Sequence, residues 1–214
     1  MSQNVLEMTP VRAVGMITSV GSYHGFVWCE TIGRQVGVES RLEGDTTVVF
    51  DLDPQITWLC EQPKTFKVPF KGKTKSYTPD FVIVRNGRSY FVEVKPWKKA
   101  NKAEMREWFA FLKRYFAKLG HGFIVLTERE IQRQPRLRNA ELIRRYADGS
   151  CNDGHVIRLK QFTKGERSIS LGKLQSLAAA NDNLPNAYSF IKSGRARIDM
   201  SKPVNDNTTV SLTA

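Results

Sequence analysis

The sequence has few cysteines and histidines and no long hydrophobic segment. Its three cysteines, Cys29, Cys60 and Cys151, are odd in number and show no CxxC spacing, which argues against a disulfide framework. The three histidines form no pair at helical spacing, so neither residue type predicts a zinc site. No stretch approaches the roughly 18 apolar residues of a membrane span, and the N-terminus has no basic region followed by an apolar core. These absences disfavour a membrane protein and a secreted protein, so we expect a cytoplasmic one.

Positive charge is abundant in this chain of 214 residues, whose formal net charge is +12. A basic balance indicates a polyanionic partner, with nucleic acid as the first candidate. The character of the sequence changes after residue 135, which predicts two domains, 1–135 and 136–214. The first part holds 20 basic and 14 acidic residues and the second holds 13 and 7, so each part carries +6.

The most informative segment surrounds Asn86-Gly87, which lies between two β-rich stretches and predicts a two-residue hairpin turn. With these two residues as the turn, the numbers of paired residues sum to 173, so Asp80 falls opposite Glu93. Lys95 is two residues beyond Glu93 and points to the same face. The pattern therefore places two carboxylates and an ammonium group together.

Opposed carboxylates normally destabilise a hairpin, but a hard divalent cation between them would reverse that effect. Residues 81–84 and 90–92 are apolar on both faces, as in a buried strand. Charged groups at the ends of buried strands need partners, because an unpaired buried charge is costly. Two other interpretations stay open here, namely a structural salt bridge among the three residues and a solvated hairpin face.

Other local patterns predict the elements around this hairpin. Ser40 is a candidate N-cap for a helix, and Glu43 has the spacing of a capping box, which is an alternative role for that glutamate. Apolar residues at helical spacing, followed by Gly120, predict a long amphipathic helix. The expected helices cover 41–51 and 100–119, and the expected strands cover 56–60, 66–70, 77–85, 88–95 and 123–126. The last strand follows a helical crossover, which favours parallel pairing.

The second part of the chain has a different pattern. Three helices are predicted over 139–146, 170–180 and 184–193, with Gly194 ending the last. Two strands are predicted over 195–200 and 208–212. Helices followed by a hairpin suggest a winged-helix domain that binds DNA or a protein partner.

The segments Tyr77 to Phe81 and Glu93 to Pro96 resemble the signature of PD-(D/E)xK nucleases. The predicted αβββαβ succession is the core of that restriction-endonuclease-like α/β fold. Further short matches are similar to the TnsA family, the endonuclease subunits of heteromeric cut-and-paste transposases. They include Ser40 to Glu43 and Leu126 to Ile131, and the resemblance covers about residues 37–146.

This resemblance implies a Mg²⁺-dependent DNA endonuclease, in which Mn²⁺ can substitute. Asp80, Glu93 and the Val94 carbonyl would hold the metal, Glu43 would ligate a second metal or a metal-bound water, and Lys95 would orient the attacking water. The implied substrate is double-stranded DNA at the transposon ends, cut at the strands that carry the 5′ ends. The implied partners are a DDE-type transposase subunit, TnsB, and an AAA+ regulator, TnsC, in a bacterial cytoplasm.

Three lysines that follow the second motif strand, Lys98, Lys99 and Lys102, are candidates for contacts to DNA phosphates, or else form a solvated helix start. Two other functions stay open at this point. The chain could be a stand-alone restriction or repair nuclease of the same fold, or a non-catalytic scaffold that binds DNA or protein. The sequence fits both a mechanism with one metal ion and a mechanism with two.

Overall fold

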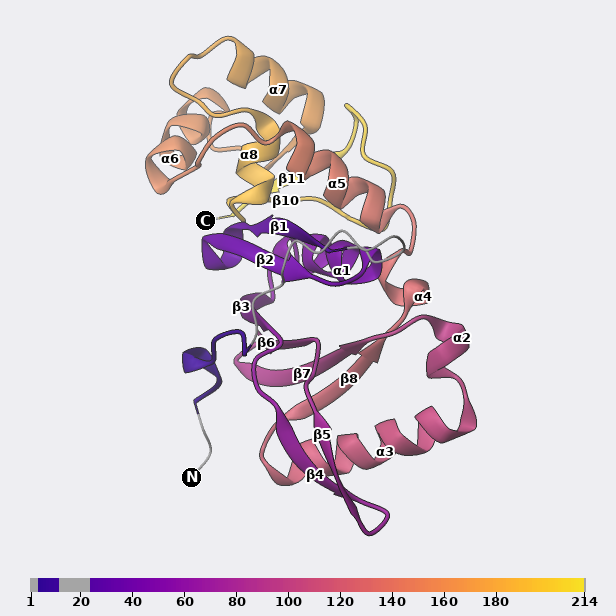
Figure 1. Cartoon of the computed structure of the whole chain (residues 1–214). Coiled ribbons are helices and arrows are strands. Elements are labelled where there is room, and N and C mark those ends of the chain that lie inside the picture. The colour runs from indigo at the N-terminus through magenta and orange to yellow at the C-terminus, as the bar shows by residue number, and fades with distance from the viewer. Residues whose placement is uncertain (1–3, 12–23, 214) are drawn as a thin grey trace. The chain divides into compact units, whose positions relative to one another are not determined.

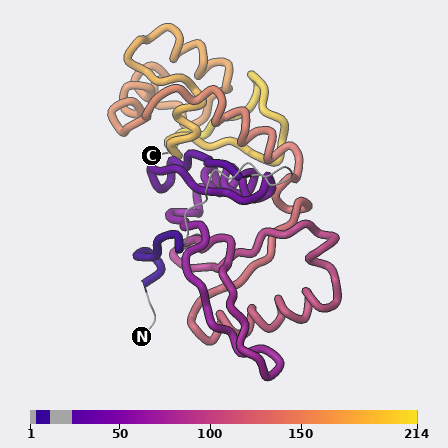
Figure 2. Tube along the Cα trace, in the orientation of Figure 1, coloured from indigo at the N-terminus to yellow at the C-terminus, as the bar shows by residue number. Residues whose placement is uncertain are grey.

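The computed structural model describes residues 4–11 and 24–213, and Figures 1 and 2 show the course of the chain. The chain divides into two compact units, Met1–Arg133 and Gln134–Ala214. This division falls two residues before the boundary expected between residues 135 and 136. The first unit contains the hairpin around Asn86-Gly87.

The first unit is built on a four-stranded mixed sheet with the order β3-β6-β7-β8. Its strands are β3 (Ile56–Glu61), β6 (Phe81–Arg85), β7 (Arg88–Val94) and β8 (Gly122–Leu126). The pairs β3–β6 and β6–β7 are antiparallel, whereas β7–β8 is parallel. The parallel pairing expected for the strand after the long helix is therefore confirmed.

The turn between β6 and β7 has the expected two residues. Asn86 and Gly87 have φ values of 50° and 73°, the left-handed conformation that this hairpin turn requires at both positions. The ladder runs from Arg85 opposite Arg88 to Phe81 opposite Val92, so every pair sums to 173 as predicted. A short local sequence therefore sets the register of the strands that carry the candidate site.

Helix α1 (Arg41–Asp51) begins and ends where the sequence predicted. Ser40 is its N-cap, and its hydroxyl accepts a hydrogen bond from the Glu43 backbone N–H at 3.2 Å. Val49 and Phe50 are buried, and the Phe50 ring meets Phe81 of the sheet edge-on at 5.9 Å. The helix thus packs its apolar side against one face of the sheet.

The crossover from β7 to β8 contains two helices rather than the one predicted over 100–119. A short helix, α2 (Trp97–Ala100), precedes the long helix α3 (Ala103–Lys118). Gly120 follows α3 with φ 83°, and its backbone N–H donates to the carbonyl of Ala117 at 3.1 Å. This is the C-terminal glycine signal that the sequence indicated.

Apolar side chains pack on both faces of the sheet. One cluster contains Val82, Phe91, Leu112, Phe116 and Phe123, so α3 covers that face. The opposite cluster contains Phe50, Leu59, Phe81, Ile83 and Val92. In residues 4–11 and 24–213, no helix is both long and apolar enough to span a membrane.

One predicted strand, 77–85, is wrong in its first half. Tyr77 ends a separate strand, β5 (Lys73–Tyr77), which pairs with β4 (Phe66–Phe70) in a two-stranded sheet of its own. Pro79 has no backbone N–H to donate, which helps to interrupt the chain before β6 begins. The remaining elements of this unit are η1 (Val5–Glu7), β1 (Gly25–Cys29), η2 (Glu30–Ile32), β2 (Arg34–Val38) and α4 (Glu128–Ile131).

The second unit combines four helices with a three-stranded sheet of order β10-β11-β9. Its helices are α5 (Arg136–Tyr146), α6 (Asp153–Phe162), α7 (Leu171–Ala179) and α8 (Ala187–Lys192). Its strands are β9 (Ser168–Ser170), β10 (Ala196–Arg197) and β11 (Thr209–Leu212). Buried side chains from several of these elements form its core, including Leu159, Leu171, Leu174, Phe190 and Val210.

The sequence predicted this unit less completely than the first. Helix α6 and strand β9 were not predicted, and the strand expected over 195–200 is limited to Ala196–Arg197. The helix predicted over 184–193 is shorter, because Asn186 caps it by accepting the Ser189 backbone N–H at 3.0 Å. The added strand β9 supplies the third member of the sheet.

Candidate functional site

The predicted site lies where β6 begins and β7 ends. Asp80 directly precedes β6, Glu93 is in β7, and Lys95 follows the last residue of β7. The Val94 backbone N–H donates a hydrogen bond to Asp80 Oδ2 at 2.7 Å, which ties the two strand ends together. The structure therefore brings Asp80, Glu93 and Lys95 into one neighbourhood.

Glu93 is almost completely buried, with 5% of its surface exposed. The hydroxyl of Tyr77 donates to its Oε2 at 2.8 Å, and the Lys95 ammonium forms an ion pair with its Oε1. Both carboxylate oxygens of Glu93 thus have a donor. The Tyr77 contact was not predicted, because the sequence placed Tyr77 in the same strand as Asp80 rather than at the end of β5.

Electrostatics distinguish Asp80 from an ordinary aspartate. Burial raises the pKa of Asp80 from 3.8 to about 8, and the negative charges of Glu93 and Glu43 add to this effect. The Val94 N–H and the Lys95 ammonium oppose the rise without cancelling it. The rise follows mainly from burial, so ionisation of Asp80 is costly without a compensating positive charge nearby.

Glu43 comes to this region from helix α1. Its carboxylate accepts hydrogen bonds from the Glu39 backbone N–H and the Ser40 hydroxyl, both at 2.8 Å. Glu43 therefore helps to hold the start of α1, but through the Glu39 N–H and the Ser40 hydroxyl rather than through the Ser40 backbone N–H of a capping box. Burial raises the pKa of Glu43, and the charges of Glu39 and Glu93 raise it further.

The chemistry of this donor set fits a hard cation. Carboxylate and backbone carbonyl oxygens are the ligands that Mg²⁺ prefers, and one or two carboxylates with several waters are a common Mg²⁺ site. In the described ranges 4–11 and 24–213, no group of three or more His, Cys, Asp or Glu side chains is arranged to hold a metal. The pair Asp80 and Glu93, with the Val94 carbonyl, is thus the set to test.

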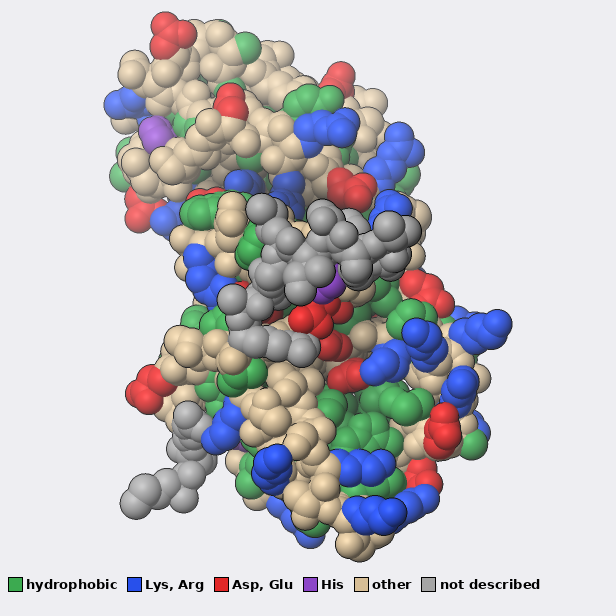
Figure 3. All heavy atoms as spheres, viewed as in Figure 1, with side chains coloured by type: hydrophobic (Ala, Val, Ile, Leu, Met, Phe, Trp, Pro, Cys, Tyr) green, Lys and Arg blue, Asp and Glu red, His purple; other side chains and the backbone are tan. Residues whose placement is uncertain are grey.

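The three lysines proposed for DNA contacts are all exposed. Lys98 and Lys99 lie on α2, and Lys102 is the N-cap residue of α3. Figure 3 shows basic side chains beside a group of acidic ones on this side of the first unit. Their exposure leaves them available to a polyanion.

Two contacts that the sequence did not indicate hold α2 in place. Glu128 accepts a hydrogen bond from the Trp97 backbone N–H at 2.7 Å. The Arg129 guanidinium lies 3.7 Å from the centre of the Trp97 ring. Both partners come from α4, far along the chain, so no local pattern could have identified them.

A mixed α/β unit with carboxylates and a lysine at the ends of two neighbouring strands is consistent with a nuclease fold. Residues 53–128 match the family described as TnsA-like endonuclease N terminal. This match supports a TnsA-type nuclease, and the matched segment includes Asp80, Glu93 and Lys95 but not Glu43. A search of curated proteins found no match.

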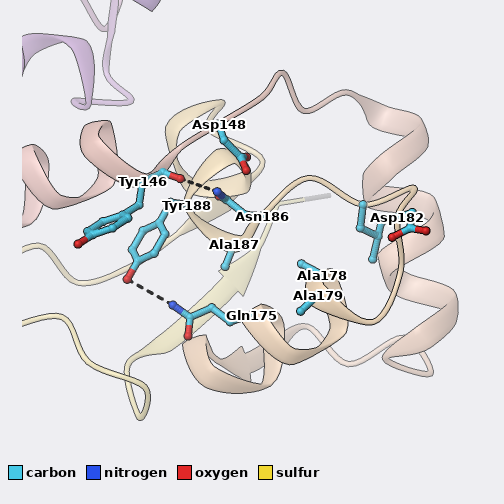
Figure 4. Close-up of a pocket in the computed structure, with 10 residues that line it drawn as sticks. Tyr146, Asp148, Gln175, Ala178, Ala179, Asp182, Asn186, Ala187 and Tyr188 are labelled. Carbon is cyan, nitrogen blue, oxygen red and sulfur yellow. Dashed lines mark hydrogen bonds between the residues drawn. The ribbon is translucent and has the colours of Figure 1, made fainter.

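The second unit contains a pocket of about 500 Å³ between the ends of α5 and α7 and the start of α8 (Figure 4). Asn186 donates to the Tyr146 carbonyl, and the Gln175 amide donates to the Tyr188 hydroxyl at 3.3 Å. The side chains that line it include Asp148 and Asp182 and no lysine or arginine. The pocket is therefore a poor place for a DNA phosphate.

Proposed function

We propose that this chain is the metal-dependent endonuclease subunit of a heteromeric cut-and-paste transposase. It would hydrolyse the phosphodiester bonds at the 5′ ends of the transposon. The observation that carries the proposal is the half-buried Asp80 with the buried Glu93 and Lys95, within a TnsA-like domain. The PD-(D/E)xK signature and the αβββαβ order of α1, β3, β6, β7, α3 and β8 support it.

Asp80, Glu93 and the Val94 carbonyl would hold Mg²⁺, with Mn²⁺ as a substitute. Glu43 would ligate a second ion or a water on the first. When bound, the ion would neutralise negative charge on the scissile phosphate, and it would make a water bound to it easier to deprotonate. Because burial raises the pKa of Asp80 to about 8, loading the site near neutral pH would require this carboxyl to lose a proton.

Lys95 and Tyr77 would contribute through their side chains rather than by binding the metal. The Lys95 ammonium, which pairs with Glu93, would orient the attacking water and stabilise charge that develops on the phosphoryl oxygens. Tyr77 fixes the Glu93 carboxylate through its hydroxyl and is a positioning residue. The exposed Lys98, Lys99 and Lys102 would contact phosphates that flank the cut.

The order of elements in the second unit supports a winged-helix domain. Helix α6, strand β9, helices α7 and α8, and strands β10 and β11 follow one another, and β11 lies between β9 and β10. In that arrangement α8 takes the place of the helix that reads DNA. Four of its residues are buried, namely Ala187, Ser189, Phe190 and Ile191.

The burial of α8 and the acidic pocket beside it favour a protein partner for this domain over DNA. Family resemblance suggests two candidates, the DDE-type transposase subunit TnsB and the AAA+ regulator TnsC. Co-purification of each with this chain, before and after Asp148→Lys and Asp182→Lys, tests whether the pocket takes part.

The first experiment on the proposed function is calorimetric titration of Mn²⁺ into the wild-type protein and into Asp80→Ala. We expect binding in the wild type and its loss in the variant, because the variant lacks one of two carboxylate ligands. The proposed metal site uses residues of this chain alone, whereas the proposed transposase role would need partner subunits for cleavage. Absence of wild-type binding, with DNA also present, would refute a metal-dependent nuclease and favour a non-catalytic scaffold.

The second experiment measures cutting of transposon-end DNA with the partner subunits supplied. Lys95→Ala should abolish cutting at the 5′ ends while DNA affinity changes little. If Lys95→Ala cuts as well as the wild type does, then Lys95 is not an active-site residue. Sequence-specific cutting by the wild type alone would indicate a stand-alone restriction or repair nuclease.

A further inference from the structure

The β4–β5 hairpin is a strongly basic projection of the first unit. Between Glu61 and Asp80 the sequence has no acidic residue and five lysines, Lys64, Lys67, Lys71, Lys73 and Lys75. The hairpin forms a two-stranded sheet that is not paired with the four-stranded one, and it extends along α3 (Figure 1). Such a concentration of one charge on a single element requires an explanation beyond the general basicity of the chain.

Aromatic packing fixes one face of this hairpin to α3. The ring of Phe66 meets Phe116 at 5.0 Å, and the ring of Phe70 meets Trp108 at 4.8 Å, both edge-on. Val68, between them on the same face, is fully buried. The hairpin is therefore a supported arm with a defined orientation, and we call residues 66–77 the basic arm.

Lys67 lies on the face of the hairpin away from α3, and Lys71 lies in its turn, where it pairs with Glu107 of α3 at 2.6 Å. Lys73 and Lys75 lie opposite Phe70 and Val68, on the face that α3 supports. Lys67, Lys71, Lys73 and Lys75 are all exposed. Lys75 Nζ lies 4.9 Å from the centre of the Phe70 ring and 5.1 Å from that of Trp108, so its charge sits above an aromatic surface. Figure 3 shows lysine and arginine side chains gathered around an apolar patch at this end of the unit.

The base of the arm is joined directly to the candidate active site. Tyr77 is the last residue of β5, and its hydroxyl donates to Glu93 at 2.8 Å. From Tyr77 to Lys73 the strand advances about 13 Å at roughly 3.3 Å per residue. With about 3.4 Å per base pair, the arm spans about four base pairs of duplex beginning at the site.

We propose that the basic arm binds the phosphate backbone of duplex DNA beside the cleaved bond and does not read its sequence. This inference rests on the proposed nuclease function and extends its DNA contacts beyond Lys98, Lys99 and Lys102. The competing explanation is that the lysines protect the exposed edges of a two-stranded sheet from self-association. The two explanations differ in whether removal of charge changes DNA affinity or the oligomeric state.

The test uses the full chain with Lys95→Ala and EDTA, so that no DNA is cut. Affinity for two 30-base-pair duplexes of unrelated sequence is measured by fluorescence anisotropy at several salt concentrations. The arm variant carries Lys67→Gln and Lys73→Gln, which leave the aromatic contacts of Phe66 and Phe70 in place. The matched control carries Lys160→Gln and Lys164→Gln in the second unit and loses the same charge.

The arm variant should bind both duplexes roughly tenfold more weakly per lysine at 0.1 M salt than its parent. The slope of log affinity against log salt should fall by about 0.9 per lost phosphate contact. The control should keep both the affinity and the slope. If the arm variant and the control have the same DNA affinity and salt dependence, the proposal is overturned. If the arm variant forms a new oligomer while its DNA affinity is unchanged, the lysines protect the sheet edges instead.

Failure of this proposal can be told apart from failure of the proposed function. Mn²⁺ titration is repeated on the arm variant without the Lys95 change, and the arm makes no predicted metal contact. Retained Mn²⁺ binding with unchanged DNA affinity would reject the arm and keep the nuclease site. Absent Mn²⁺ binding in the wild type would reject the nuclease site, and the anisotropy result would still decide whether the arm binds DNA.

Discussion

At the scale of single residues, Asp80 is the group whose chemistry differs most from that of the free amino acid. Its half-buried carboxyl lies beside two other acidic side chains, and burial raises its pKa to about 8. A cation and a proton compete for the same oxygens, because a carboxylate ligand has to be ionised before it coordinates. This competition makes the metal affinity of the site depend on pH.

Mn²⁺ affinity should therefore rise about tenfold per pH unit from pH 6 to pH 8 and level off above the pKa of Asp80. Calorimetry at pH 7 in two buffers with different ionisation enthalpies should detect release of about one proton per bound ion. At pH 9 the release should be close to zero. A proton count near zero at pH 7 would show that Asp80 is already ionised in the metal-free protein.

The same pKa has a consequence for stability. The folded-state pKa of Asp80 is raised from 3.8 to about 8, so the unfolded chain loses this proton at lower pH than the folded protein does. The free energy of unfolding should then fall as pH rises from about 4 through about 8. Asp80→Asn, which cannot ionise, should be more stable than the wild type by a few kcal/mol at pH 8.5 and nearly equal to it near pH 4.

Urea unfolding in EDTA, followed by tryptophan fluorescence, measures this difference. All four tryptophans, Trp28, Trp58, Trp97 and Trp108, lie in the first unit and report on its unfolding. Asp182→Asn in the second unit removes the same charge from an exposed position and serves as the control. A stability gain that is independent of pH would contradict the assignment of the raised pKa to Asp80.

At the scale of elements, the parallel pairing of β7 with β8 depends on one close approach. A Cβ atom added to Gly122 would lie 2.2 Å from Cδ1 of Tyr90, its partner across the ladder. The ring or the strand would have to move to admit even a methyl group. Glycine at this position therefore lets the tyrosine ring lie over β8.

Gly122→Ala should lower the free energy of unfolding by about 1–3 kcal/mol, the usual cost of overpacking. Gly149→Ala is the matched control, since nothing lies within 4 Å of its added Cβ. In a Tyr90→Ala background the cost of Gly122→Ala should shrink, which a double-mutant cycle measures. An unchanged cost in that background would place the strain elsewhere.

The elements differ in how well their sequences predicted them. Helix α1 and the β6–β7 hairpin were predicted in position and register, because a cap and a two-residue turn act over a few residues. Strand β5 is mostly polar and was missed, since its pairing partner and α3 support it rather than its own pattern. In α6, the apolar residues Ile157 and Phe162 are exposed at 61% and 45%, which weakens the periodic signal that identifies a helix.

At the scale of the whole molecule, the first unit contains every residue of the candidate site. Its two apolar clusters draw only on residues before position 134. Each unit therefore has a core of its own, which is the usual requirement for independent folding.

A fragment of residues 1–133 should unfold cooperatively in urea and should bind Mn²⁺ with an affinity close to that of the full chain. Tryptophan fluorescence and calorimetry measure the two properties. The same fragment with Asp80→Ala is the control for the metal site. A fragment that folds but fails to bind Mn²⁺ would show that the second unit contributes to the site.

The sequence by itself determined the features that depend on near neighbours in the chain. These are the two-residue turn, the register of β6 and β7 out to Phe81 opposite Val92, and the amphipathic pattern of α3. Tertiary structure alone decided which of these groups are buried and what they contact. It brings Glu43 from α1 and Tyr77 from β5 to the Glu93 carboxylate, and it packs the α3 aromatic rings against the β4–β5 hairpin. Burial depends on segments far apart in the chain, so the raised pKa of Asp80 and the support of the basic arm had no local signal.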